Sequence, residues 1–366
     1  MIESHHPENS IFINPNNSKS AWIWDKKHEL ILITFLTLLY YFYHPTTIPG
    51  HDNAEFLKLA LEGGIAHPPG YPLLINLYRM IHFLSPTGAS VEILSFFSIL
   101  CTIIAACITM RMLRWFVSLP AALFSCLVIF SSVPIAREAT SLEPFALNLL
   151  LSASVMWVTL RLIGFGATCS PKQTNLLCAL WGLLWAFGLC NHHSQIFLLP
   201  FSVLSLIQTK SSSIPRRFLW AVLGIIIGSL PLISMWVYVD DYTMRQWALG
   251  ESRLEIIFNH IIRKYYGTLE VSHQIQSSFI GILFYLQRLP MWFTFVFYIL
   301  ILLGFVRFYK MLTNETNPKL RFAWLGIFLT WLLLTWIFPL MLGGNQADYW
   351  HAHIQRFLCL SVWILA

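Results

Sequence analysis

The sequence predicts an all-α polytopic membrane protein with about nine or ten transmembrane helices and a helical first outer loop. Of its 366 residues, 57% are hydrophobic and only 11% are charged, and the mean hydropathy is +0.64. One soluble core cannot bury that much apolar surface, so lipid must serve as part of the solvent. Apolar segments recur along the chain, each near the roughly 20 residues that a helix needs to cross a bilayer.

The order of polar and apolar segments predicts a short tail followed by one membrane module. Residues 1–28 are largely polar and contain no apolar run as long as the core of a signal peptide. Residues 29–366 form the module, because no polar linker in them is long enough to mark a second domain. The expected spans lie near residues 29–43, 91–110, 116–133, 144–160, 176–190, 195–209, 218–238, 290–306 and 322–341. A tenth apolar segment begins near Phe357 and has about ten residues, too few to cross, so we expect the module to be truncated in its last helix.

The distribution of basic residues predicts a cytoplasmic N-terminus. With that orientation, 14 of the 23 lysines and arginines fall on the inner side: Lys19, Lys26, Lys27, Arg111, Arg114, Arg161, Lys172, Lys210, Arg216, Arg217, Arg307, Lys310, Lys319 and Arg321. This bias follows the positive-inside rule. It places residues 45–90 in a periplasm or lumen, with a bacterial inner membrane as the expected location. The net charge of +6 is then a mark of topology, and no basic-aromatic domain suggests a nucleic-acid partner.

The sharpest chemical signal is an acidic pair in the first outer loop. Asp52 and Glu55 are three residues apart and would share one face of a short helix that the Gly63-Gly64 pair ends. The following His67-Pro68-Pro69-Gly70 predicts a rigid, extended turn. Asp52 is the candidate general base, since partial desolvation at a membrane interface strengthens a carboxylate as a proton acceptor. Glu55 would orient the acceptor molecule whose hydroxyl gives up a proton to Asp52, or would share that proton. Both residues could instead cap the helix N-terminus.

The other outer loops collect further polar side chains, including nine lysines and arginines that the positive-inside rule disfavours there. A phosphate-bearing ligand at the outer interface would explain them. The candidates for donor or phosphate binding are His67, His192, His193, His260, Arg263, Lys264 and Arg356. Further outer-face candidates are Arg137, Glu143, Trp247 and Tyr266.

Each of these candidates also has a structural interpretation. His67 could fix its turn by hydrogen bonding, and the His192-His193 pair could be satisfied by loop backbone. Arg263 and Lys264 could contact lipid headgroups. Glu143 could balance Arg137 as an ion pair. We expect no metal and no cofactor. Removing a proton from a hydroxyl and holding a phosphate need neither, and an Asp-x-x-Glu pair alone does not make a metal site.

At these residues the sequence resembles the GT-C membrane glycosyltransferases, and within them the protein O-mannosyltransferase-like group. The matching stretches are Asp52 to Glu55, Gly64 to Leu73 (GIAHPPGYPL), Glu143, Gly188 to Ser194 (GLCNHHS), Trp247, His260 to Gly267 (HIIRKYYG) and Arg356-Phe357. The resemblance runs from about residue 30 to the end, and the HPPGYPL stretch with its acidic partner is its most specific part.

The resemblance implies a GT-C-like bundle whose active site lies on the outer face. It implies a polyprenyl-phosphate sugar donor that enters sideways from the bilayer. A carboxylate of the first loop would take the proton of an acceptor hydroxyl during transfer with inversion. Mannose or another hexose is the expected sugar, and the acceptor could be a protein, a lipid or a glycan.

Two other interpretations stay open. The first is a secondary transporter, although nearly every ionisable residue falls in a loop or at the end of a span, and no internal repeat is visible. The second is an inactive remnant of an enzyme, in which a truncated chain keeps the acidic loop.

Overall fold

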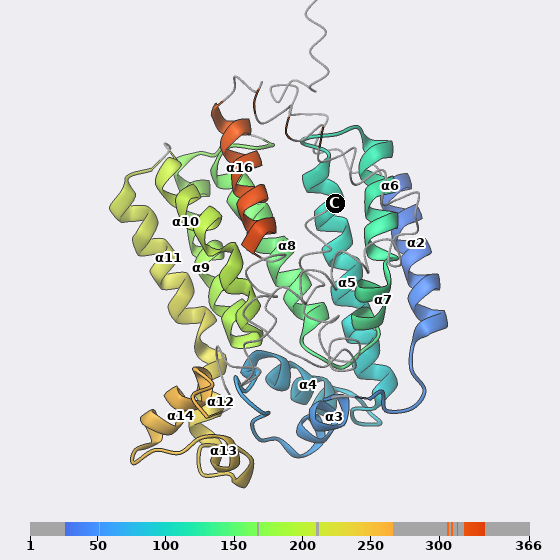
Figure 1. Cartoon of the computed structure of the whole chain (residues 1–366), viewed down its shortest axis with the longest axis vertical. Coiled ribbons are helices and arrows are strands. Elements are labelled where there is room, and N and C mark those ends of the chain that lie inside the picture. Colours follow the sequence, from blue (N-terminus) through green and yellow to red (C-terminus); the bar gives the residue numbers. More distant parts are fainter. Residues whose placement is uncertain are drawn as a thin grey trace, which may run out of the picture.

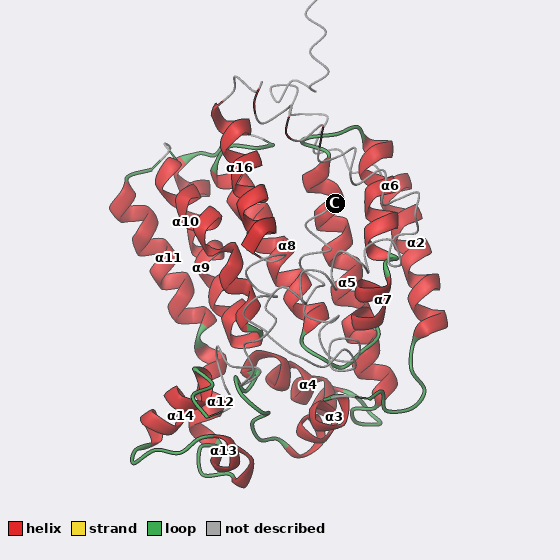
Figure 2. Cartoon of the chain, viewed as in Figure 1, coloured by secondary structure: helices red, strands yellow, loops and turns green. Residues whose placement is uncertain are grey.

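The computed structural model describes residues 26–50, 52–166, 168–209, 212–265 and 318–333, with Val306, Tyr309 and Thr313 as isolated positions. Every regular element in these ranges is a helix, and none is a strand (Figure 2). Four helical stretches are long and apolar enough to cross a membrane: α5 (Val91–Leu113), α8 (Phe145–Leu162), α9 (Pro171–Asn191) and Ile214–Val237. The predicted class, an all-α polytopic membrane protein, is confirmed.

The predicted spans in the described ranges correspond to helices, but three of them are interrupted near prolines. The predicted span at 116–133 contains α6 (Leu119–Phe130), and a second helix, α7 (Val133–Ala139), begins at its end. The two helices meet at 72°, with Pro134 in the first turn of α7. The 195–209 segment starts as the 3₁₀ helix η1 (His193–Leu198) and continues as α10 (Leu199–Gln208). The third interrupted span, predicted near residues 218–238, divides into α11 (Ile214–Gly228), η2 (Leu230–Leu232) and α12 (Ile233–Val237). Proline lacks the N–H that would continue a helix, so the helix ends and restarts there.

Two further predicted spans are helical in part. The first contains α2 (Lys26–Tyr43), and the last contains α16 (Pro318–Leu332). The predicted span at 290–306 and the segment from Phe357 lie outside the described residues, apart from Val306. The total of nine or ten spans therefore stays a prediction.

Small residues hold α9 and α11 close together. A Cβ atom on Gly182 of α9 would collide with the carbonyl oxygen of Ala221, and one on Gly224 would collide with that of Ala179. Glycines at a helix crossing let two backbones approach closely, which is how membrane helices pack where the hydrophobic effect is weak. On α11, Ile226 and Ile227 remain exposed, as expected for side chains that face lipid.

Two short helices lie across one end of the bundle (Figure 1): α3 (Asn53–Glu62) and α4 (Pro72–Leu84). They confirm the helical first loop. The side chains of α4 pack on α5 and α8, and the buried Tyr78 hydroxyl donates to the carbonyl oxygen of Leu142 over 3.0 Å. The bundle core and the α3–α4 layer thus form two adjoining apolar clusters.

A small lobe lies beside this layer, made of α12, α13 (Tyr242–Trp247) and α14 (Arg253–Ile261) (Figure 1). It has its own apolar cluster, formed by Ile65, Met235, Val239, Met244, Ala248 and Ile256. Ile65 comes from the linker between α3 and α4. The linker is therefore anchored between the bundle and the lobe, and His67 follows directly in it.

Candidate active site

The acidic pair lies at the start of α3. Asp52 occupies the N-cap position, but its side chain makes no capping hydrogen bond. Glu55 lies in the first turn, and each carboxylate is 34% exposed. Capping therefore does not explain the position of the Asp52 carboxylate. Both groups lie at the protein surface and remain partly accessible to a substrate.

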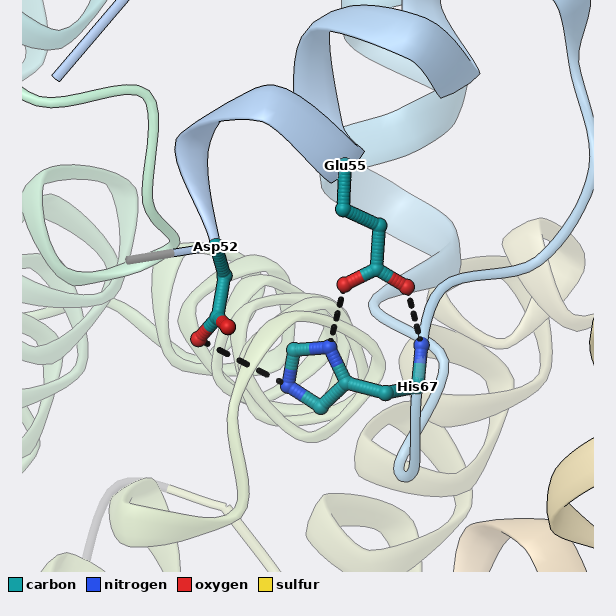
Figure 3. Close-up of side chains that lie close together, drawn as sticks. All are labelled: Asp52, Glu55 and His67. Carbon is teal, nitrogen blue, oxygen red and sulfur yellow. Dashed lines mark hydrogen bonds and ion pairs between the residues drawn. The ribbon is translucent and has the colours of Figure 1, made fainter. Parts of the chain in front are cut away.

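His67 lies between the two carboxylates (Figure 3). Glu55 accepts the backbone N–H of His67 through Oε1 over 2.7 Å, and its Oε2 lies 2.5 Å from His67 Nδ1. On the opposite edge of the ring, His67 Nε2 is 3.9 Å from Asp52 Oδ2. The histidine side chain is 10% exposed. The sequence predicted His67 as a donor-binding residue, and the structure places it against the acidic pair.

The aromatic ring of Tyr71 links His67 to the histidine pair that follows α9. The Tyr71 hydroxyl is 3.3 Å from His67 Nε2, and its ring stacks on that of His192 with centroids 6.0 Å apart. Tyr71 has φ of +47°, a left-handed conformation that is uncommon for a residue with a side chain. Such strain is found most often at functional sites, where the surrounding packing enforces it.

His192 is held by a polar network at the end of the bundle. Its Nδ1 accepts the backbone N–H of Ser194 over 3.1 Å, so its ring proton is on Nε2 in the neutral form. The Ser194 hydroxyl lies 2.8 Å from the same Nδ1 and accepts from the Asn148 amide over 2.9 Å. Ser194 and Asn148 therefore fix the orientation of His192 from two neighbouring helices.

The lobe contributes His260 and Arg263. His260 is fully buried, its Nε2 is 3.0 Å from the Ala66 carbonyl oxygen, and its ring packs on Gly70. Burial lowers the pKa of His260 to about 4, so the ring is neutral at pH 7. Burial likewise lowers the pKa of His193, next to the end of α9, to about 4, and the nearby charge of Arg263 adds to this effect. Arg263 thus lies beside the histidine pair, and it also has a left-handed φ of +60°.

Arg137 and Glu143 lie on the α7–α8 side of the acidic pair. With Glu138 they line a cavity of about 220 Å³ that the end of α2 and Asn53 complete. Glu143 is buried and its Oε1 accepts from the Asn53 amide over 3.3 Å, while Asn53 Oδ1 accepts the backbone N–H of Leu142 over 2.6 Å. Asn53 therefore fastens the start of α3, and with it Asp52, to the bundle.

The remaining candidates are not brought to this cluster by any described contact. Trp247 ends α13 and is half-buried, and Lys264 is exposed with its ammonium over the neighbouring Tyr265 ring, 5.4 Å from the centroid. Tyr266 and Arg356 lie outside the described residues.

Asp52, Glu55 and His67 have the composition of a metal site, with one possible ligand atom each, all within 4.8 Å of one another. However, Glu55 Oε2 and His67 Nδ1 are 2.5 Å apart, the distance of a hydrogen bond. Two ligands about 2.1 Å from one cation at right angles are separated by roughly 3 Å. As it stands, Glu55 and His67 are hydrogen-bonded, with Asp52 3.9 Å from the other side of the ring, and an ion would have to break the Glu55–His67 bond.

Sequence reasoning missed Asn53 and Tyr71. Asn53 stands inside the acidic motif and Tyr71 inside HPPGYPL, so their positions were the available signal. It also missed the Asn148–Ser194 support of His192, which comes from residues 46 positions apart.

Comparison with known proteins identifies the same region. Residues 52–214 match the family model described as the N-terminal domain of protein O-mannosyl-transferase TMEM260. The matched region contains the acidic pair, His67, the α7–α8 side and the His192-His193 pair. This part of the chain is therefore similar to the protein O-mannosyl-transferase group. This confirms the group that the sequence resembled.

Two O-mannosyltransferase relatives extend the comparison. Protein O-mannosyl-transferase TMEM260 of Mus musculus is 26% identical over 235 residues, which is 62% of this chain and 33% of the relative. Protein O-mannosyl-transferase tmem260 of Dictyostelium discoideum is 24% identical over 326 residues, which is 85% of this chain and 40% of the relative. The chain thus spans well under half the length of these curated relatives. No solved structure matches it significantly.

Proposed function

We propose that this chain is the membrane module of a glycosyltransferase that moves a sugar from a polyprenyl-phosphate donor to a hydroxyl group of a protein. The relatives' names favour mannose as the sugar and a protein as the acceptor. The observation that carries the proposal is the partly exposed Asp52 carboxylate, which caps no helix and faces His67 inside the matched region. A partly exposed carboxylate that faces a histidine ring has the properties of a general base.

The proposed reaction makes two demands on the site. An acceptor hydroxyl that attacks the anomeric carbon must lose a proton, and the departing phosphate must be stabilised. Asp52 takes the proton in this proposal. Arg263 is the foremost group for the phosphate, because guanidinium can hold two phosphate oxygens at once. His192, His193, His260, Lys264 and Arg356 complete the proposed donor site.

We further propose an inverting GT-C type of transfer on the outer side of the membrane. The positive-inside bias supports a cytoplasmic N-terminus and a site in the periplasm or lumen, with a bacterial inner membrane as the proposed location. A donor with its lipid in the bilayer could reach this site sideways. No soluble carrier would then be needed.

The proposal is tested by supplying membranes that contain the full chain with a panel of labelled polyprenyl-phosphate sugars. We expect one donor, with mannose favoured, to be consumed and its label to appear on protein. Asp52→Asn at equal abundance should consume almost none. If neither chain uses any donor, the proposal is wrong. If both use it equally, Asp52 is not the base.

A further inference from the structure

We infer that His67 is the proton-receiving partner of Asp52 and that Glu55 is the residue that positions it. This inference rests on the proposed glycosyl transfer and assigns His67 a role in proton movement in place of donor binding. It follows from the contacts of one ring, each edge of which faces a different carboxylate.

The first step is the tautomer of His67. Glu55 binds the same residue twice, through the backbone N–H at 2.7 Å and through ring Nδ1 at 2.5 Å. A carboxylate accepts hydrogen bonds, so Nδ1 carries a proton and donates it to Glu55. In the neutral ring, Nε2 then holds the lone pair. That nitrogen faces Asp52.

The second step is the charge around the ring. Among the described contacts, the titratable groups that face His67 are Asp52 and Glu55 at the start of α3, Tyr71 of the linker and His260 of the lobe. His260 is neutral at pH 7 because burial lowers its pKa to about 4. A proton that arrives on His67 Nε2 therefore creates an imidazolium between two carboxylates, which stabilise it. Tyr71, 3.3 Å from Nε2, can accept a hydrogen bond from that proton.

The third step is the reaction itself. The acceptor oxygen forms a bond to the anomeric carbon, and the bond from that carbon to the phosphate oxygen breaks. Its electron pair leaves with the polyprenyl phosphate. The acceptor proton passes to Asp52 and then to His67 Nε2, which restores the Asp52 carboxylate. Release of the proton from His67 to water completes the cycle.

The gap of 3.9 Å between Asp52 Oδ2 and His67 Nε2 is wider than a hydrogen bond. Catalytic hydrogen bonds are often long without substrate and shorten in the reacting complex. Asp52 does not cap α3 through its side chain, so a turn of the carboxylate toward the ring leaves the cap of the helix unchanged.

The test is chemical rescue of His67→Ala in the full chain, with transfer from polyprenyl-phosphate mannose to protein as the readout. We expect kcat to fall roughly 10²-fold with little change in KM for the donor, as for loss of one acid–base group. Substituted imidazoles should restore part of the rate, and the restored rate should increase with their basicity. A residue that only packs or fixes a turn gives no such dependence.

His82→Ala is the matched control. His82 is also a histidine of the α3–α4 layer, but its Nδ1 accepts the backbone N–H of Ala89 over 3.0 Å, a purely structural bond. Its variant should keep kcat and show no response to imidazoles. Equal rescue of both variants would overturn the inference.

A second variant covers the case in which His67→Ala does not fold. Glu55→Gln keeps the size of the side chain but weakens the bond to Nδ1, so kcat should fall while KM for the donor stays. In ¹⁵N-histidine spectra of the native chain, the Nδ1 proton of His67 should resonate at low field and shift in Glu55→Gln.

The outcomes separate the two proposals. Suppose that the native chain transfers sugar, that Asp52→Asn does not, and that His67→Ala and Glu55→Gln transfer at the native rate. That result would overturn this inference and leave the proposed function standing. No transfer by the native chain overturns both.

Discussion

Two clusters of charged residues at opposite ends of the bundle differ in how their charges are matched. At the start of α2, Glu29 is paired with Arg111 of α5 through two bonds, Nε to Oε1 at 2.8 Å and Nη2 to Oε2 at 3.0 Å. At the α3–α4 end, two carboxylates share the single ring of His67. The first cluster is one anion with one cation in a bidentate geometry. The second places one histidine ring between two carboxylates.

The difference shows what each cluster is suited to do. A matched bidentate pair has little left to offer a ligand and serves to hold two helices together. The Asp52 carboxylate is 34% exposed and 3.9 Å from His67 Nε2, so it can be reached by a substrate that gives up a proton. The Glu29–Arg111 pair is therefore the structural reference for the site, and the predictions below compare the two clusters.

The largest expected effect is on catalysis at the site. Asp52→Asn should lower the rate of transfer roughly 10²- to 10⁴-fold, the usual contribution of a general base. The melting temperature in detergent should change little, because the Asp52 side chain is 34% exposed and asparagine keeps its size. A parallel loss of melting temperature would show that Asp52 is structural, like Glu29.

Acidic pH should destabilise the protein at the end of the bundle where the candidate active site lies. Burial lowers the pKa of His260 from 6.5 to about 4, so below pH 6.5 the unfolded chain binds more protons than the folded one. The stability that this group contributes is complete above pH 6.5 and is lost as the pH falls toward 4, by about 2–3 kcal/mol. Melting temperatures of the native chain and His260→Gln, measured from pH 7 to 4.5, should differ in slope. Equal slopes would contradict the assignment.

Breaking the Glu29–Arg111 pair should lower stability and leave the transfer rate unchanged, which is the reverse of what we expect for Asp52→Asn. Glu29 is buried, so Glu29→Gln weakens two bonds to a guanidinium and should lower stability by about 1–3 kcal/mol. The transfer rate per folded molecule should stay at the native level. Thermal unfolding and a rate normalised to folded protein would check both, and a selective loss of rate would contradict the comparison.

The smallest effect is expected at a third ion cluster, on the lobe. Asp240 binds Arg245 at 2.7 Å and Arg253 at 2.5 Å, but about half of each side chain is exposed. Water and salt screen such pairs, and they contribute little. Asp240→Asn should leave both the melting temperature and the transfer rate unchanged. A clear drop in either would show that the lobe depends on this cluster.

The membrane class could be predicted because composition and the length of apolar segments determine it. The interrupted helices could not, because an average over about 20 apolar residues hides single prolines such as Pro134 and Pro231. Those prolines were visible, and they mark the breaks.

The site was predictable where it is local in sequence. Asp52, Glu55 and His67 fall within one stretch of 16 residues, so their proximity followed from a helix and a turn. The pairing of His67 with the carboxylates did not follow, since a turn of unknown direction could present its ring to either side. The approach of His260 and Arg263 is a tertiary contact, made by an element nearly 200 residues away.

The central claim is that Asp52 and His67 move one proton as a unit. The most direct test is a double-mutant cycle on kcat with Asp52→Asn, His67→Gln and the double variant, all measured with the same donor. When two groups act as one unit, removing either one already removes the contribution of both to kcat. The double variant should therefore be about as slow as Asp52→Asn alone. If the two losses multiply, the residues act independently and the claim is wrong.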